Sequence, residues 1–217
     1  MTAIPLARAA RRLQHRLPRT FALAALGLTL VGPVACATKS VSRINPADVT
    51  DLSGRWNDTD SRLVANQLIE QSLGAEWMKG FRNSHGGESP SVIVGDFANR
   101  TSEHIPVGTF VKDLENAFVR SGSVRVVASA QERAELRGEK ADQQQNARTD
   151  TRAKLGMEQG ARYMLKGELQ SIADAAGRER IMYYQVDATL IDLETNTKVW
   201  VGQHKIKKYI ERKPFGL

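Results

Sequence analysis

Residues 91–128, SVIVGDFANRTSEHIPVGTFVKDLENAFVRSGSVRVVA, predict a strand, a helix and a second strand in succession. The run 91–97 is almost continuously apolar, which is typical of a strand covered on both faces. Over 107–118, apolar residues recur at spacings of three and four, which indicates an amphipathic helix, and Gly122 marks its end. The second strand, 124–128, is therefore expected to run parallel to the first across the helix.

The segments on either side continue this alternation. On the N-terminal side, residues 58–60 offer helix-capping oxygens ahead of a helical apolar spacing that runs to Leu73. On the C-terminal side, Ser129 and Glu132 have the spacing of a capping box. The helix that they begin, 130–147, has almost no apolar stripe, so it is expected to be either solvated or used for contact.

The last third of the chain predicts one short helix and three strands. Capping residues at 149–150 indicate a short helix that ends near Gly160. Strands follow at 162–172, 180–193 and 198–210, and their short, turn-rich connections imply antiparallel hairpins.

The chain is expected to have three parts. Residues 1–35 contain arginines, no acidic residue and an apolar run too short to span a bilayer, which are the features of a lipoprotein signal. Residues 36–55 are rich in small and polar residues and predict a flexible tether. Residues 56–213 are long enough to bury a core. They predict one domain of the α/β (α+β) class, a mixed and mostly antiparallel sheet flanked by helices.

Cys36 is the only cysteine and follows directly on the apolar run. Cleavage before it would place the thiol at a new N-terminus, where bacterial lipoproteins are acylated, so we expect lipidation there. Ala37 favours the outer membrane, whereas Pro33 departs from the leucine usual at that position. Plain cleavage, an uncleaved anchor and a catalytic thiol are the alternatives. A nucleophilic cysteine needs a histidine and an electropositive pocket, and the neighbouring residues supply neither.

The net charge of +7 belongs largely to the signal. Five of the 31 basic residues lie within 1–35, which leaves 26 basic against 24 acidic residues in the rest of the chain. Nucleic-acid binding is therefore not expected. A single cysteine also means that no intrachain disulfide can form.

The motif search points away from catalysis. The sequence has no P-loop, dinucleotide-binding, nucleophile-elbow or C-x-x-C motif, and no two histidines have metal-ligand spacing. We therefore expect no catalytic residue, no metal and no cofactor. One alternative is a hydrolase that uses His104, because Asp96, Ser102 and Glu103 lie near it in the loop after a strand.

Five stretches, in order, resemble the LpoB family, outer-membrane lipoproteins that activate bifunctional penicillin-binding proteins. They are SGRWNDTDSRLVA (53–65), the stretch 91–129, QERAELRGEKADQQ (131–144), KLGMEQGARYMLKGELQSI (154–172) and YYQVDATLIDLETNTKVWVGQHKIKK (183–208). The resemblance covers nearly all of 41–213. It implies a fold similar to the first domain of TolB and to the periplasmic part of the curli channel subunit.

The resemblance also implies a function without chemistry of its own. The protein would be lipid-anchored at the periplasmic face of the outer membrane and act as a monomer. It would bind the periplasmic part of an inner-membrane peptidoglycan synthase and stimulate polymerisation and crosslinking. A curli-channel-like assembly component is the alternative, although no strand pair has the alternating, aromatic-flanked pattern of a membrane hairpin. Residues 37–55 would make a short tether, with a reach of at most about 65 Å.

Two segments are predicted to contact the partner. The stripe-free helix offers Arg133, Arg137 and Gln144. The loop after the first strand is the second candidate, because loops held by a rigid sheet often carry function; it offers Arg100, Thr101, Glu103 and His104. Since arginine is common at binding hot spots, Arg100 and Arg133 are expected to matter most. The alternatives are that the helix is merely solvated, and that the basic run 205–213 is the contact.

Overall fold

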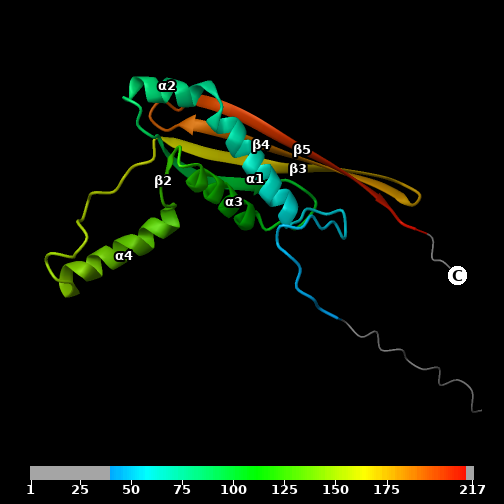
Figure 1. The fold of residues 1–217 in the computed structure, drawn as a ribbon, viewed down its shortest axis with the longest axis horizontal. Coiled ribbons are helices and arrows are strands. Elements are labelled where there is room, and N and C mark those ends of the chain that lie inside the picture. The colour runs from blue at the N-terminus through cyan, green and yellow to red at the C-terminus, as the bar shows by residue number, and fades with distance from the viewer. Residues whose placement is uncertain (1–39, 214–217) are drawn as a thin grey trace, which may run out of the picture. The chain divides into compact units, whose positions relative to one another are not determined.

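A five-stranded mixed sheet organises the part of the chain that this computed structural model describes, residues 40–213 (Figure 1). β1 pairs in parallel with β2 and β3, and the β3–β4 and β4–β5 pairs are antiparallel. The predicted parallel pair and the two C-terminal hairpins are therefore confirmed, as is the mixed α/β class. In spatial order the strands are β2 (Arg125–Val126), β1 (Ser91–Asn99), β3 (Tyr163–Ala176), β4 (Glu179–Asp192) and β5 (Lys198–Glu211).

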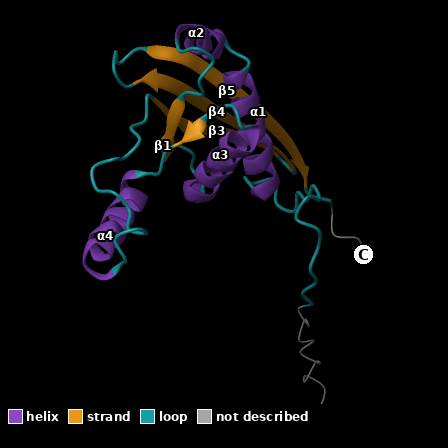
Figure 2. Cartoon of the chain, turned by 60° about the vertical axis from the view of Figure 1, so that its left-hand side comes forward, coloured by secondary structure: helices purple, strands orange, loops and turns teal. Residues whose placement is uncertain are grey.

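Four helices form within residues 40–213, and they divide into two groups. α1 (Asp58–Leu73), α2 (Glu76–Ser84) and α3 (Val107–Ser121) lie on one side of the sheet (Figure 1). α1 packs against α3 and β5, and α3 packs against β1 and β2. α4 (Ala130–Asn146) instead follows β2 (Figure 1), stands away from the sheet (Figure 2) and buries no side chain.

The core lies between the sheet and the helices α1 and α3. Phe110, Leu114 and Phe118 on α3 are fully buried, and they share one apolar cluster with Leu165 and Leu190 of the sheet. Burying a large apolar side chain contributes about 1.5–3 kcal/mol. The predicted packing of helix 107–121 against the sheet and the burial of Phe110 are both confirmed.

The helix ends follow from local hydrogen bonds. Asn57 caps α1 in a reciprocal capping box, one position before the predicted stretch 58–60. Ser129 and Glu132 form the predicted capping box of α4. Gly122 ends α3 with a φ of 62°, a left-handed conformation that glycine adopts without strain.

The sequence does not predict α2. This helix has nine residues, of which Trp77, Met78 and Phe81 are buried. Three apolar positions over two turns are too few to establish a period, so tertiary packing determines this helix. Trp77 and Phe81 both meet the ring of Tyr163 edge-on, with centroids 5.0 and 5.8 Å apart.

The short helix predicted from 149–150 to Gly160 is wrong, because these residues form turns and irregular backbone. Two side chains of α4 explain the difference. The Oε1 of Gln143 accepts the main-chain N–H of Ala153 at 2.9 Å, and the Nε2 of Gln144 donates to the C=O of Ala153 at 2.7 Å. The N–H and C=O of Ala153, in the middle of the segment, are thus bonded by α4 instead of by neighbouring turns of a helix.

Residues just before α1 are held against β5. The Nζ of Lys208 donates to carboxylate oxygens of Asp51 and Asp60, both at 2.6 Å, and to the C=O of Arg55 at 3.1 Å. Burial works against the charge of Lys208, but these carboxylate bonds leave its pKa above the ordinary value. The compact unit begins at Asn45, whereas Cys36 and the predicted signal lie outside the described residues.

Candidate partner-binding surface

Glu103 ties the loop after β1 to the core. Its carboxylate accepts the hydroxyl of Tyr184 at 2.8 Å and the main-chain N–H of Trp56 at 3.3 Å. Burial, followed by the bond to Glu103, raises the pKa of the Tyr184 hydroxyl. Glu103 is one of the residues predicted to contact the partner, and its side chain also fixes the position of the loop.

Thr101 shapes the same loop from within. Its main-chain N–H and its hydroxyl both donate to Oδ1 of Asn99, at 2.9 and 2.7 Å, and its Oγ1 accepts the N–H of Glu103 at 3.1 Å. Arg100 and His104 are the exposed members of the four residues predicted in this loop. Arg100 makes only a long ion pair, 3.8 Å, with the partly exposed Glu168. Arg100 and His104 are therefore the loop residues free to contact a partner.

The predicted residues of α4 make contacts within the chain. The Nη1 of Arg133 donates at 2.6 Å to the C=O of Ala128, two residues beyond the end of β2. Arg137 forms a bidentate pair with Glu158, with both distances at 2.9 Å, and this pair lowers the pKa of the Glu158 carboxyl. Gln144 binds Ala153, as described above. The helix therefore holds the irregular segment that follows it.

The start of α4 and the loop after β1 are brought together. A groove of about 480 Å³ runs over the side of β1 and β3 opposite the core, and it is lined by Arg100, Lys166 and Glu168 together with Ser129 and Ala130. A second groove, of about 440 Å³, is lined by Arg133. Gln144 lies at the other end of α4 and lines neither. The loop after β1 therefore lies near the start of α4 and not near its far end.

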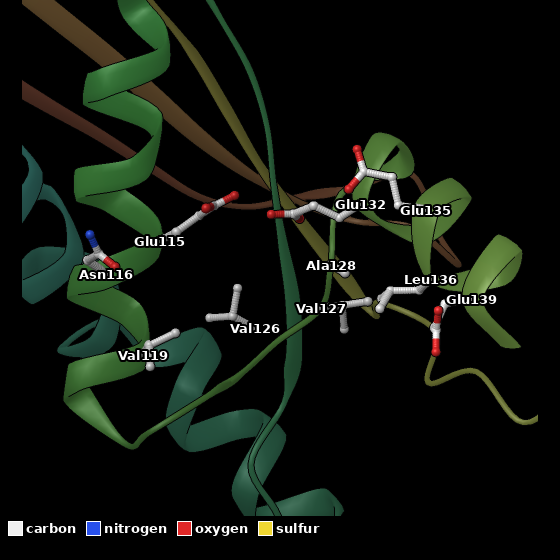
Figure 3. A pocket seen from close by; sticks show the side chains of 10 residues that line it. All are labelled: Glu115, Asn116, Val119, Val126, Val127, Ala128, Glu132, Glu135, Leu136 and Glu139. Atoms are coloured by element: carbon white, nitrogen blue, oxygen red, sulfur yellow. The ribbon is translucent and has the colours of Figure 1, made fainter. Parts of the chain in front are cut away.

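A third groove, of about 600 Å³, lies between α3, β2 and α4 (Figure 3). Its walls carry four glutamates, and sequence reasoning missed it. The sequence contains a signal for this groove, because three of the glutamates recur at helical spacing on α4. Lys112 bridges two of the four, donating to Glu115 at 2.7 Å and to Glu132 at 3.0 Å, and these bonds raise its pKa to about 12. The four are Glu115, Glu132, Glu135 and Glu139.

Residues 40–213 also lack two other kinds of feature. These residues contain no group of three or more histidine, cysteine, aspartate or glutamate side chains placed to hold a metal ion. None of the helices they form has the length and apolar character that a membrane span requires.

The fold and the surface define a small α/β domain with charged grooves on its surface. The sequence model of the peptidoglycan-synthase activator LpoB matches residues 60–206, which is more than half of the chain. The chain therefore belongs to the LpoB family of peptidoglycan-synthase activators. This membership does not favour the curli-channel alternative.

Some of the solved structures that are similar to this chain belong to the same family. The LpoB C-terminal domain from Salmonella enterica is 17% identical, covers 69% of this chain and 99% of its own, and has a TM-score of 0.39. The corresponding domain from Escherichia coli is 16% identical, with the same coverage and TM-score. E. coli LpoB solved by NMR is 16% identical and covers 94% of this chain and 96% of its own, with a TM-score of 0.39. Among curated proteins, no sequence matches.

Proposed function

We propose that this protein is a non-enzymatic regulator that binds and stimulates a bifunctional peptidoglycan synthase, a penicillin-binding protein of the inner membrane. The observation that carries the proposal is the family match over residues 60–206, which spans most of the described domain. The absence of catalytic motifs from the sequence is in keeping with a regulator.

The protein would act from the outer membrane. In this proposal Cys36 carries the lipid, the part of 36–55 that precedes the compact unit at Asn45 forms the tether, and the domain is a monomer on the periplasmic side. Two or three acyl chains are needed for stable anchoring, since one binds only marginally. Replacing Cys36 with serine should abolish incorporation of labelled fatty acid, and equal labelling of that variant would exclude lipidation at this position.

The synthase is proposed to contact the end of the domain where the loop after β1 meets the start of α4. Arg100 and His104 are exposed there, and Arg133 lies on the adjoining groove. Glu103 and Thr101 support this surface from within, and Arg137 supports α4 through its exposed pair with Glu158.

A direct test uses the chain from residue 37 onward as bait in an extract of its own cell envelope. The expected result is capture of a bifunctional synthase. Its glycan polymerisation and peptide crosslinking should then rise when the purified protein is added. The protein alone, incubated with peptidoglycan, should release no product. Release of product by the protein alone, or capture without any stimulation, would contradict the proposal.

A further inference from the structure

The edge strand β2 leaves one residue, Val126, free on the main-chain edge that faces away from β1, while the C=O of Ala128 beyond it accepts Arg133 of α4. The N–H of Arg125 donates to the C=O of Pro90 at 2.9 Å, and the N–H of Val127 donates to the C=O of Val92 at 2.8 Å. Val126 lies between them and directs its own N–H and C=O away from β1. Neither group has a hydrogen-bond partner within residues 40–213. An unpaired strand edge of this kind is a template for another extended chain.

α4 stands beside this edge and leaves a crevice. The two grooves next to α4 share four lining residues, Val126, Val127, Ala128 and Leu136, so they are the two faces of one crevice between β2 and α4. Figure 3 shows Val127 and Leu136 on its opposite sides. Leu136 is 50% exposed, and Val119 on the α3 rim is 61% exposed. The unpaired main-chain groups of Val126 therefore lie next to apolar side chains.

The two faces of the crevice differ in charge. The face toward α3 carries the four glutamates; Lys112 pairs with Glu115 and Glu132, and within residues 40–213 the other two form no ion pair. The opposite face carries Arg125, Arg133 and Lys140, while its one acidic residue, Glu158, is paired with Arg137. Successive side chains of a strand point to opposite faces. A strand in this crevice would thus place alternate side chains against an acidic and a basic wall.

We propose that this crevice binds an extended segment of the partner enzyme, which adds a strand to β2. The segment carries basic side chains at alternate positions, with acidic or apolar side chains between them. The identity of the partner rests on the proposed function, whereas the chemistry of the segment rests on the crevice alone.

A second copy of this chain fits the crevice less well. Its other free sheet edge, β5, carries Lys205 and Lys207 at alternate positions. The opposite face of β5 is already occupied, since Ile206 packs on the core and Lys208 is bound to Asp51 and Asp60. A strand in the crevice needs both of its faces free.

The crevice can be tested with a peptide, independently of any synthase. The probe is a fluorescent nonapeptide, Lys-Val-Lys-Glu-Lys-Val-Lys-Glu-Lys, titrated against the chain from residue 37 onward. We expect binding by anisotropy and slower hydrogen exchange at the amide of Val126. A variant with Glu135→Lys and Glu139→Lys, both at exposed positions, should bind about tenfold more weakly or worse. The matched control Glu70→Lys, exposed on α1, should bind like the parent.

Two control peptides separate strand addition from simple charge attraction. One has the same composition with its lysines consecutive, and the other is N-methylated at its central residues, so that it cannot pair through its main chain. Equal binding of either control, unchanged exchange at Val126, or no binding at millimolar peptide would overturn the proposal. Light scattering that shows a dimer lost in the double variant would assign the crevice to a second copy and overturn it as well.

The synthase provides the second arm of the test. Binding of the parent and about tenfold weaker binding of the double variant are expected. If the synthase binds both equally, the crevice inference fails and the proposed function stands. If no synthase binds the parent, the proposed function fails together with the named partner, and the peptide titration still decides whether the crevice takes a strand.

Discussion

The helices α3 and α4 are similar in length, 15 and 17 residues, and follow each other across β2, yet they are held in different ways. α3 buries four side chains, among them Phe110 and Leu114, and α4 buries none. α4 is positioned by its capping box and by polar contacts such as Arg133 with Ala128 and Arg137 with Glu158.

This difference concerns how each helix can respond to a partner. Apolar burial ties α3 to the cooperative unfolding of the whole domain. Exposed ion pairs contribute only about 0–1 kcal/mol each and weaken with salt. α4 can therefore shift or fray locally at small cost, as regions that respond to binding commonly do. Such a shift would change the shape of the grooves that flank α4.

The strongest test of this contrast removes a ring from α3. Phe110→Ala should lower the free energy of unfolding by about 3–5 kcal/mol, because the ring is fully buried and meets Trp56 and Phe97 edge-on. Chemical denaturation would measure the loss. Val119→Ala on the same helix, where the side chain is largely exposed, is the control and should change stability little. An unchanged unfolding midpoint for Phe110→Ala would refute the assignment of α3 to the core.

The ion pair between Lys208 and Asp60 is polar but mostly buried, so it shows whether polarity or burial determines how much a contact stabilises the domain. Lys208→Met leaves Asp60 without its cation where both side chains are mostly buried, so we expect a loss of about 3 kcal/mol. The matched control is Lys79→Met, which breaks an exposed pair with Glu76 and should cost about 0.5 kcal/mol or less. Equal effects of the two substitutions would show that burial does not decide the strength of these pairs.

The sequence predicts the apolar helix α3 better than it predicts the polar contacts of the loop after β1 and of α4. The apolar period of α3 predicts both its ends and its buried face, because local spacing and burial coincide there. The role of Glu103 could not be predicted, since its partners Tyr184 and Trp56 lie 81 and 47 positions away. The segment around Ala153 was assigned to a helix because local patterns do not record that Gln143 and Gln144 satisfy its main chain.

Charge reversal at the predicted contact residues should have a smaller effect, and on synthase binding instead of stability. Arg100→Glu and Arg133→Glu should each weaken synthase binding about tenfold, which is ~1.4 kcal/mol. Arg178→Glu, exposed in the turn between β3 and β4, is the control and should bind like the parent. Because Arg133 also contacts Ala128, circular dichroism must accompany its titration. If neither arginine affects binding and charge reversal within 205–213 does, the contact lies on β5 instead.

Acid should weaken α4 before it weakens α3. Hydrogen bonds from the main chain of Ser129, and then from Lys112, lower the pKa of Glu132 to about 2, against an ordinary value of 4.5. Because the folded-state pKa is the lower one, the contribution of this carboxylate to α4 is complete above about pH 4.5 and is lost as the pH falls toward 2. α3 has no acidic residue in its first turn and is held by burial.

The amide signals of α4 are therefore expected to move toward unfolded positions over this range, while those of α3 stay in place. Nuclear magnetic resonance at a series of pH values measures both helices in one sample. In Glu132→Gln the side chain no longer titrates, so the first turn of α4 should lose this dependence on pH. Signals of α3 and α4 that moved together would show that the two helices unfold as one unit. The polar attachment of α4 would then be as cooperative as the core, and its grooves could not adjust independently to a bound strand.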